Sequence, residues 1–374
     1  MPCAEFHIQY MKILFDHQAF SNQKYGGISR YFANLHYGLN ASTDVESKLG
    51  LVFTHNAYIN KKSLPAGGLL EPIIKKQSRR NKYNKWYCRH LLRQGDFDVF
   101  HPTYYNPYFL DSVKKPFVIT VHDMIHELYP NYFATQDALT AGYKKQVINK
   151  ADHIIAISDC TKRDLQKFYS IPDDKITVIY HGYKMSNDFV SSPRVEVRDK
   201  YLLFVGDRAV YKNFGLFVDA TAPLLLKYDL QLICSGGGDF TATEQELFSK
   251  VNITDRIQQI SASDAELAAL YANAEAFVYP SLYEGFGLPV LEAFSNNCPV
   301  IMSNTSSLPE VGGDAAQYFD PMSQSSIASA IEAVISNKNL QSELRTKGKQ
   351  RLNLFNFDNT LKQTINVYKQ VTRQ

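Results

Sequence analysis

The sequence predicts an α/β protein made of two Rossmann-like, doubly wound domains that face a cleft. Three observations carry this prediction. The chain has 374 residues, more than one hydrophobic core usually supports. Short apolar runs alternate with helical patterns, and most of these runs are continuous, as in buried parallel strands. A mostly polar stretch, 183–200, interrupts this alternation, and we interpret it as an interdomain linker.

The first half is expected to form a parallel sheet with helices between its strands. The expected strands are 13–16, 48–53, 99–101, 117–122, 153–157 and 176–180, and the expected helices are 28–39, 83–92, 136–150 and 161–169. Residues 1–10 are expected to lie outside the fold. We therefore assign 11–182 to an N-terminal Rossmann-like domain.

The second half repeats the alternation. The expected strands are 201–205, 231–235, 257–260, 276–279 and 300–303, and the expected helices are 215–227, 244–251, 265–274 and 289–296. We assign 201–356 to a C-terminal Rossmann-like domain. The last segment, 357–374, is expected to form a helix over 359–371 that crosses back to the first domain. Ligands of such folds bind at the carboxyl ends of the strands, where the cleft is expected.

Composition and charge exclude several classes of protein. Hydrophobic residues make up 45% and charged residues 21%, as in ordinary globular proteins. The net charge of +3 is too small to indicate a nucleic-acid partner. Five scattered cysteines without a CxxC argue against a disulfide framework or a thiolate zinc site. No run has the length of a membrane span or the pattern of a signal peptide, so a cytoplasmic location is expected.

The most informative segment is 281–293, which is SLYEGFGLPVLEA. It follows an expected strand and enters an expected helix. Gly285 and Gly287 allow a tight turn, so that backbone N–H groups can face an anion at the helix N-terminus. Glu284 lies on the turn and Glu292 about one turn inside the helix. A carboxylate there can accept hydrogen bonds from two neighbouring hydroxyls, such as those of a ribose.

This segment resembles the Glu-x7-Glu signature of glycosyltransferase family 4, whose members are retaining enzymes with the GT-B fold. Residues 272–280 and 201–213 resemble the family's approach to that signature and the opening of its donor domain, so the resemblance covers nearly the whole chain. It implies these donor-binding residues: Gly26, Gly27, Arg208, Lys212, Glu284, Gly285, Phe286, Gly287, Leu288 and Glu292. It implies these catalytic residues: His122, Glu284, Arg208 and Lys212.

The resemblance implies that Arg208 and Lys212 clamp the donor diphosphate. Sugar transfer leaves a nucleotide diphosphate, so negative charge grows on the leaving phosphate and fixed cations stabilise it. Two cations can take over the electrostatic role of a metal ion. We therefore expect no metal and no cofactor other than the nucleotide-sugar substrate.

Two features of the first half fit the same family. Gly26 and Gly27 precede an expected helix and resemble the family's glycine-rich loop, although the pattern is not the GxGxxG of dinucleotide-binding proteins. His122 ends an expected strand and matches a histidine that lies beside the reacting sugar in the family. Asp123 would either orient that imidazole or cap the next turn. Ser158 matches another recurrent family position of less certain role.

The expected function is that of a retaining, metal-independent hexosyltransferase. It would move a hexose-type sugar from a UDP- or GDP-sugar to a glycan or lipid-linked acceptor, in bacterial surface polysaccharide biosynthesis. The first domain would bind the acceptor and the second the donor. The main alternative is a catalytically inactive nucleotide- or sugar-binding module of the same fold. A phosphorylase of this fold would carry a lysine-bound pyridoxal phosphate, and no sequence feature identifies such a lysine.

Two sequence patterns would instead indicate a metal site. His122 and His126 are spaced as in the HExxH of zinc proteases, but the segment leaves a strand, whereas that motif needs a helix. Asp96 and Asp98 form a DxD, but they precede an expected strand instead of ending one.

The segment from Lys75 to Arg93 contains eight Lys or Arg residues and no acid. Aromatic residues interleave with them at helical spacing. Such a helix can lie on an anionic membrane surface. It is therefore a candidate for a peripheral contact with the inner face of the cell membrane, and the alternative is an ordinary solvated helix face.

Overall fold

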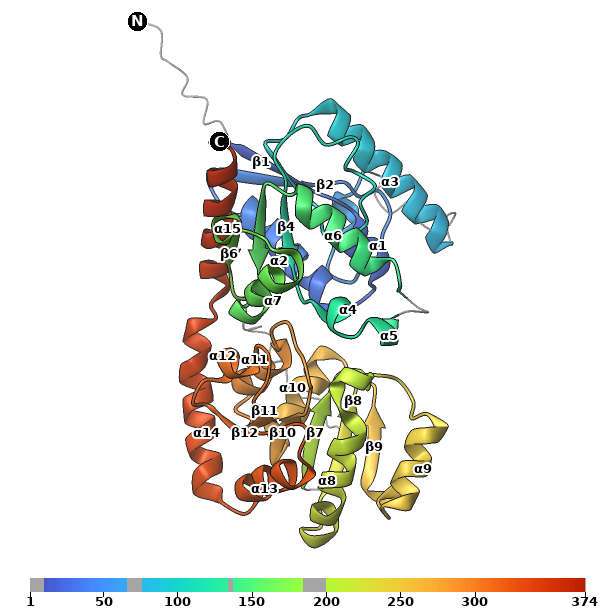
Figure 1. Ribbon diagram of the computed structural model, residues 1–374, viewed down its shortest axis with the longest axis vertical. Helices are drawn as coiled ribbons and strands as arrows, with labels where there is room; N and C mark the ends of the chain where they lie inside the picture. Colours follow the sequence, from blue (N-terminus) through green and yellow to red (C-terminus); the bar gives the residue numbers. More distant parts are fainter. Residues whose placement is uncertain (1–9, 66–75, 134–136, 184–199, 374) are drawn as a thin grey trace, which may run out of the picture. The chain divides into compact units, whose positions relative to one another are not determined.

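The computed structural model describes residues 10–65, 76–133, 137–183 and 200–373. The chain divides into two compact units, with boundaries after Tyr180 and before Asp358. One unit combines the first part of the chain with the last helix, and the other contains residues 181–357. Most of the predicted linker 183–200 lies outside the described residues. Figure 1 shows the elements of both units coloured along the chain.

The first unit is built on parallel strands. They are β1 (Met11–Phe15), β2 (Val45–Leu49), β3 (Val99–His101), β4 (Val118–Val121), β5 (His153–Ala156) and β6 (Ile176–Val178). Their order is β2-β1-β3 and β4-β5-β6, and a parallel bridge between Phe100 and Phe117 joins the two groups. The strand order therefore reverses at β1 and β3, which is the point where ligands bind in doubly wound sheets.

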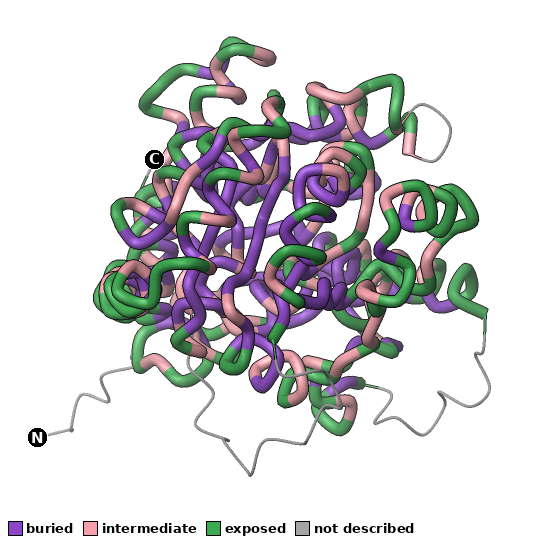
Figure 2. The backbone as a smooth tube through the Cα atoms, turned by 90° about the horizontal axis from the view of Figure 1, so that it is seen from below, coloured by how far each residue is buried: buried purple, intermediate pink, exposed green. Residues whose placement is uncertain are grey.

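The predicted helices of this unit are present as α2 (Gly27–Asn40), α3 (Gln77–Gln94), α6 (Thr140–Lys150), α7 (Asp159–Tyr169) and α15 (Phe357–Val371). The short helices α1 (Gln18–Asn22), α4 (Ile125–Leu128) and α5 (Pro130–Phe133) were not predicted. Figure 2 shows that the buried segments gather in the interior, whereas the coiled segments of the helices carry exposed faces.

The predicted strand 48–53 is wrong by several residues. β2 covers 45–49, and the chain then leaves the sheet. The N–H groups of Val52 and Phe53 donate to Oδ1 of Asn84 on α3, at 2.9 and 3.0 Å, instead of to a neighbouring strand. The apolar residues after β2 are buried beside a helix, so their hydrophobicity signals burial without signalling a strand.

The last helix, α15, belongs to the first unit. The hydroxyl of Tyr368, which is fully buried, lies 2.7 Å from Nδ1 of His101 on β3. Thr360 Oγ1 donates to the carbonyl oxygen of Tyr180 at 2.8 Å. These contacts confirm the predicted return of the C-terminal helix to the first domain.

The second unit contains one parallel sheet in the order β12-β11-β10-β7-β8-β9. Its strands are β7 (Tyr201–Val205), β8 (Gln231–Ser235), β9 (Ile257–Ile260), β10 (Ala276–Tyr279), β11 (Val300–Ser303) and β12 (Ala316–Phe319). Its helices are α8 (Phe214–Lys227), α9 (Ala242–Lys250), α10 (Asp264–Asn273), α11 (Leu288–Ser295), α12 (Leu308–Gly312), α13 (Gln324–Ile335) and α14 (Lys338–Arg351). The five predicted strands are confirmed, whereas β12, α12, α13 and α14 were not predicted.

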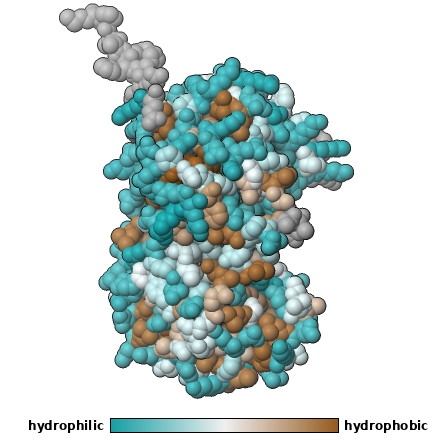
Figure 3. Space-filling view, viewed as in Figure 1, coloured by the Kyte–Doolittle hydropathy of each residue, from teal (hydrophilic) through white to brown (hydrophobic). Residues whose placement is uncertain are grey.

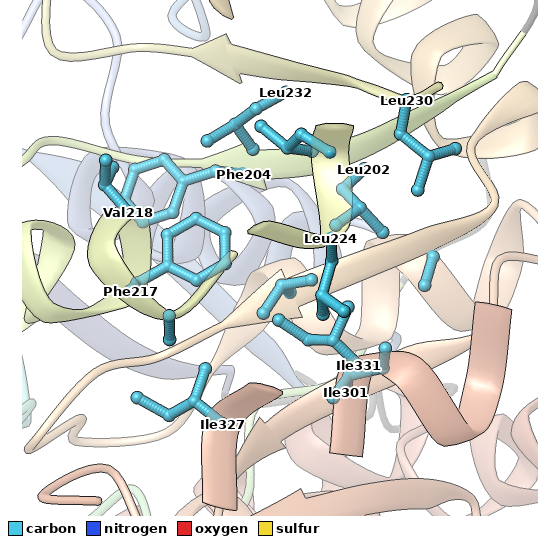
Figure 4. Close-up of a cluster of buried hydrophobic side chains, with 14 of the residues drawn as sticks. Leu202, Phe204, Phe217, Val218, Leu224, Leu230, Leu232, Ile301, Ile327 and Ile331 are labelled. Atoms are coloured by element: carbon cyan, nitrogen blue, oxygen red, sulfur yellow. The ribbon is translucent and has the colours of Figure 1, made fainter. Parts of the chain in front are cut away.

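The core of the second unit explains why its central strands are continuous apolar runs. Every residue of β7, β8, β10 and β11 is buried, which requires cover on both faces of the sheet. On one face, Phe217 of α8 and Ile331 of α13 pack in the same cluster as Phe204 of β7 (Figure 4).

Truncation of this core is expected to destabilise the second unit. Phe217→Ala should lower the free energy of unfolding by about 3–5 kcal/mol, because it removes a fully buried ring and leaves a cavity. Leu226→Ala, on the same helix at a position 48% exposed, is the control and should change it by less than about 1 kcal/mol. Urea unfolding measures both. Equal effects of the two substitutions would contradict the assigned core.

Candidate functional site

The loop between β10 and α11 depends on a glycine. Gly287 has φ +112°, in the left-handed region that favours glycine, and it is the N-cap of α11. A Cβ atom at this position would stand 3.0 Å from Leu308. Pro289 occupies the first turn, where its missing N–H costs no helical hydrogen bond. The predicted turn into a helix N-terminus is therefore present.

The loop after β11 holds this turn in place. The Ser307 hydroxyl donates to the carbonyl oxygens of Glu284 and Phe286, at 2.8 and 2.9 Å. The N–H of Glu284 donates to Ser306 Oγ at 3.0 Å. These serines were not identified from the sequence, because nothing in their local pattern indicates that they contact the loop after the neighbouring strand β10.

Lys212 and Glu284 form an ion pair at the carboxyl edge of the sheet. Lys212 ends a short 3-10 turn after β7, and its Nζ lies 2.6 Å from Oε1 of Glu284. The two side chains are 12% and 13% exposed, so water screens the pair less than a surface pair. The Tyr279 hydroxyl lies 3.4 Å from Nζ. Burial and the Glu284 carboxylate raise the pKa of Tyr279 well above its usual value, so this hydroxyl stays protonated.

Glu292 has a different environment from Glu284. It lies on α11, half-buried, and its Oε2 accepts a hydrogen bond from the Tyr271 hydroxyl at 3.3 Å. The two glutamates of the signature therefore have separate partners, which suits two separate roles.

Arg208 is engaged by several groups of the protein. Its Nε donates to Oε1 of Glu244 at 2.6 Å, and its Nη1 donates to the carbonyl oxygen of Gly236 at 3.0 Å. Its Nη2 donates to the carbonyl oxygens of Gly238 and Asp239, at 3.0 and 2.9 Å. The side chain is 5% exposed. The structure thus brings Lys212 and Glu284 together and engages Arg208 elsewhere.

In the first unit, Gly26 and Gly27 begin α2 as predicted, with Gly26 as the N-cap. The Gln23 side-chain oxygen accepts the N–H of Ser29 at 3.0 Å. A Cβ atom at Gly26 would stand 2.5 Å from that same oxygen. A glutamine side chain therefore occupies the N-terminus of this helix.

His122 follows β4 and is packed edge-on against Tyr31, with 5.6 Å between ring centroids. Burial lowers the pKa of His122 to about 4, with opposing effects from Asp123 and Lys144. The ring is therefore neutral at pH 7, with one nitrogen able to donate and the other able to accept a hydrogen bond. Asp123 Oδ1 accepts the N–H of Ile125 at 3.1 Å and lies 3.7 Å from Nζ of Lys144, so this carboxylate caps the turn and faces a buried cation.

A buried lysine supports the segment that follows His122. Lys144 of α6 is fully buried, and its Nζ lies 2.9 Å from Oε2 of Glu127 and 3.0 Å from the carbonyl oxygen of Asp123. The sequence did not reveal this residue, since its position in α6 has no distinguishing pattern.

In the described residues, His126, Asp96 and Asp98 from the two metal-site patterns form hydrogen bonds or ion pairs with other residues of the chain. His126 lies on α4 and its Nε2 is 2.9 Å from Asp137, whereas His122 precedes that helix. Asp96 and Asp98 contact Lys12 at the beginning of β1, at the amino ends of the strands. No group of three or more His, Cys, Asp or Glu side chains that could hold a metal ion is found among residues 10–65, 76–133, 137–183 and 200–373.

Ser158 caps α7: its hydroxyl oxygen accepts the N–H of Thr161 at 3.0 Å. Helix capping is therefore sufficient to explain why position 158 is a serine.

Two family models match successive parts of the chain, Glycosyltransferase Family 4 over residues 25–186 and Glycosyl transferases group 1 over residues 187–351. The O-antigen chain mannosyltransferase B of Escherichia coli is 30% identical over 298 residues, which are 74% of this chain and 76% of that protein. The chain belongs to glycosyltransferase family 4.

Other comparisons agree with membership of family 4. The O-antigen chain mannosyltransferase RfbU of Salmonella typhimurium is 32% identical over 217 residues, which are 58% of this chain and 60% of that relative, less than two thirds of its length. Sucrose-phosphate synthase from Thermosynechococcus elongatus superimposes with a TM-score of 0.75 at 19% identity, covering 97% and 99% of the two chains. Anabaena HepE, solved with UDP and glucose, gives 0.70 at 15% identity over 96% and 100%. These structures show the GT-B fold.

The loop after β11 and the loop that carries Lys212 lie beside the family 4 signature and hold its backbone in place. Lys212 lies next to the first glutamate of the signature.

Within the part of the chain that the structure describes, no helix is long and apolar enough to cross a bilayer.

The buried His122 is expected to make stability depend on pH. Its pKa is lowered from 6.5 to about 4 in the fold, so the unfolded chain binds a proton that the folded chain does not. Stability should therefore fall as the pH drops from about 6.5 toward 4. At pH 4.5 protonation of His122 in the unfolded chain should lower the free energy of unfolding by about 2–3 kcal/mol, and His122→Gln should abolish this part of the acid effect.

Denaturant unfolding at pH 7.5 and 4.5 measures this effect. The control is His90→Gln, at an exposed position on α3, which should keep the acid loss of the original protein. An equal acid loss in His122→Gln and the original protein would contradict a buried neutral imidazole.

Proposed function

We propose that this protein transfers a mannose-type hexose, with retention, from a UDP- or GDP-sugar to a glycan or lipid-linked acceptor during assembly of a bacterial surface polysaccharide. The observation that carries the proposal is the Glu284 loop, held by Ser306 and Ser307 and paired with Lys212 at the carboxyl edge of the sheet. Relatives that are named as O-antigen mannosyltransferases support the sugar class and the pathway type.

In this proposal donor binding separates the Lys212–Glu284 ion pair, and each of the two side chains then contacts the donor. Lys212 leaves Oε1 of Glu284 and contacts the leaving diphosphate, where negative charge grows during transfer. A fixed cation in a water-poor site stabilises such charge more than it stabilises the ground state. Glu284, released from Lys212, accepts hydrogen bonds from hydroxyls of the transferred sugar, together with N–H groups of the following glycine turn. Glu292 holds the ribose diol.

The first unit supplies neutral groups to the same reaction. His122 exchanges a hydrogen bond with a hydroxyl of the reacting sugar, which its neutral imidazole can do without adding charge. The N-terminus of α2, with Gly26 and Gly27, offers backbone N–H groups to a phosphate when the donor displaces the Gln23 side chain, which otherwise accepts from the N–H of Ser29. The leaving phosphate accepts the acceptor proton, so that attack and departure occur on one face and the configuration is retained. No metal ion is needed in this scheme.

The alternative, an inactive binding module, predicts a different outcome for the donor alone. An active transferase slowly hydrolyses its donor when no acceptor is present, whereas a binding module releases no nucleotide diphosphate. Incubation with GDP-mannose and with UDP-sugars, followed by measurement of released GDP or UDP, separates the two. Release of neither nucleotide would favour the binding module.

Removal of the Lys212 cation is expected to slow transfer strongly. Lys212→Ala should lower kcat by roughly 10²–10³-fold, the usual loss when one fixed group that stabilises the transition state is removed. The control is Lys227→Ala, an exposed lysine on α8 paired with Glu332, which should keep full activity. Steady-state transfer is measured with and without EDTA, and EDTA should change neither rate. Full activity of Lys212→Ala, or strict dependence on Mg²⁺, would contradict the mechanism.

We also propose a peripheral membrane contact through α3, at the cytoplasmic face of the membrane. Its outward side carries two exposed aromatic rings, Trp86 at 67% and Tyr83 at 50%, together with the exposed cations Arg79 and Lys82. These positions lie on one helical face. The surface over α3 is mostly hydrophilic (Figure 3). Lysine and arginine attract anionic headgroups while tyrosine and tryptophan suit the interface, so this face could bring the enzyme to a lipid-linked acceptor.

Vesicle binding tests this contact. The protein should sediment with vesicles of anionic lipid at low salt and remain in solution with neutral vesicles. Lys82→Glu should weaken binding about fivefold or more, since each cation near the surface contributes about 1 kcal/mol. Lys349→Glu, an exposed lysine on α14, is the matched control and should bind as the original protein does. Absence of sedimentation with anionic vesicles would overturn the proposal.

A further inference from the structure

The loop after β8 wraps around the guanidinium of Arg208. Its three glycines, Gly236, Gly237 and Gly238, have φ values of +96°, +73° and +71°. This left-handed run turns successive carbonyl oxygens toward Arg208, at 3.0, 3.4 and 3.0 Å, and that of Asp239 follows at 2.9 Å. A guanidinium has five N–H groups, and only one, on Nη1, is left outside these bonds and the bond to Glu244.

The N–H groups of the same peptides face the other way. In a trans peptide the C=O and N–H bonds point to opposite sides, so the N–H groups of residues 237–240 point away from Arg208. Within the described residues, no hydrogen bond is recorded from these four N–H groups. Successive backbone N–H groups in a turn can together bind an anion.

The packing leaves no room for a side chain at two of the three glycines. A Cβ atom at Gly237 would stand 2.6 Å from Nη1 of Arg208, and one at Gly236 would stand 3.0 Å from the carbonyl oxygen of Gly206. The guanidinium also lies over the ring of Phe240, 4.9 Å from its centroid. Arg208 is therefore held on several sides.

Glu244 completes the arrangement. Its Oε1 accepts from Arg208, while its Oε2 accepts the Thr241 N–H at 2.7 Å in a capping box at the start of α9. Burial opposes ionisation of this carboxyl, but the hydrogen bonds from Arg208 and Thr241 outweigh it and lower the pKa of Glu244. Arg208 thus ties the loop after β7 to the loop after β8 and to the helix that follows.

We propose that Arg208 is a positioning residue, which holds the loop 236–239 so that its outward N–H groups bind a phosphate of the donor's nucleotide diphosphate. Lys212 supplies the positive charge, and Arg208 acts through the loop. β7 and β8 are neighbours in the parallel sheet, so the loop lies at the same carboxyl edge as Lys212. The inference rests on the proposed function, because the anion it binds is part of the nucleotide-sugar donor.

The test separates a held loop from a direct contact of charge with phosphate. Arg208→Lys keeps the charge but loses the planar set of donors that gathers the carbonyl groups. Glu244→Gln touches no ligand in this proposal but removes the charged partner of Arg208. Arg256→Lys is the matched control, since Arg256 pairs with Asp229 in the same unit at 2.7 Å. The probes are UDP and GDP, compared with uridine and guanosine, in calorimetric titrations.

A held loop predicts that Arg208→Lys and Glu244→Gln both lose about tenfold or more in affinity for the diphosphate and keep the affinity of the original protein for the nucleoside. Amide hydrogen exchange of residues 236–240 should be faster in both variants, and slower in the original protein when the diphosphate is bound. Arg256→Lys should change none of these values. Full diphosphate affinity in Arg208→Lys, or unchanged exchange in the loop, would overturn the proposal.

The exchange measurement also keeps this inference separate from the proposed function. If the original protein binds neither diphosphate, the proposed donor is wrong. Amide hydrogen exchange of the loop in Arg208→Lys and in Arg256→Lys then still decides whether Arg208 holds the loop. Equal exchange rates in the two variants would contradict that part of the proposal.

Discussion

All strands in a parallel sheet end on the same edge, and this constraint decides where the site residues of each unit lie. In the second unit the loops after three adjacent strands, β7, β8 and β10, carry Lys212, the glycine loop and Glu284. In the first unit His122 follows β4 directly, and Gly26 lies in the connection from β1 to β2, after α1. The central strands of each sheet are buried on both faces, so the carboxyl edge is the place where polar groups can meet a ligand.

The charges at this edge are arranged so that each cation has a partner before any ligand binds. An unpaired cation in a half-buried position would be costly to desolvate. Lys212 meets that requirement with one carboxylate, at 2.6 Å, which a diphosphate can replace. Arg208 meets it with a carboxylate and several carbonyl oxygens, and replacing all of them would dismantle a loop. This difference is the basis of our proposals that Lys212 contacts the donor and that Arg208 holds a loop.

Much of the fold follows from the sequence, because continuous apolar runs and the glycine turn at 281–293 are local signals. Other features depend on partners distant in sequence. The run 48–53 is buried against Asn84 instead of a strand, and Arg208 finds Glu244, which lies 36 residues away. No local pattern encodes these contacts. β12 and helices α12–α14 were not predicted. β12 is only partly buried, α12 has five residues and α14 is mostly polar, so each of these three gives a weak local signal.

The most direct test of the central claim, that the Glu-x7-Glu segment binds a nucleotide-sugar donor, is a thermal-shift comparison of the original protein and Glu292→Ala with UDP, GDP and ADP. At about 100 times its dissociation constant, the correct nucleotide should stabilise the original protein by about 2.7 kcal/mol. The account predicts that one nucleotide raises the melting temperature of the original protein and leaves that of Glu292→Ala unchanged. A shift with none of the three, or an equal shift in the variant, would contradict it.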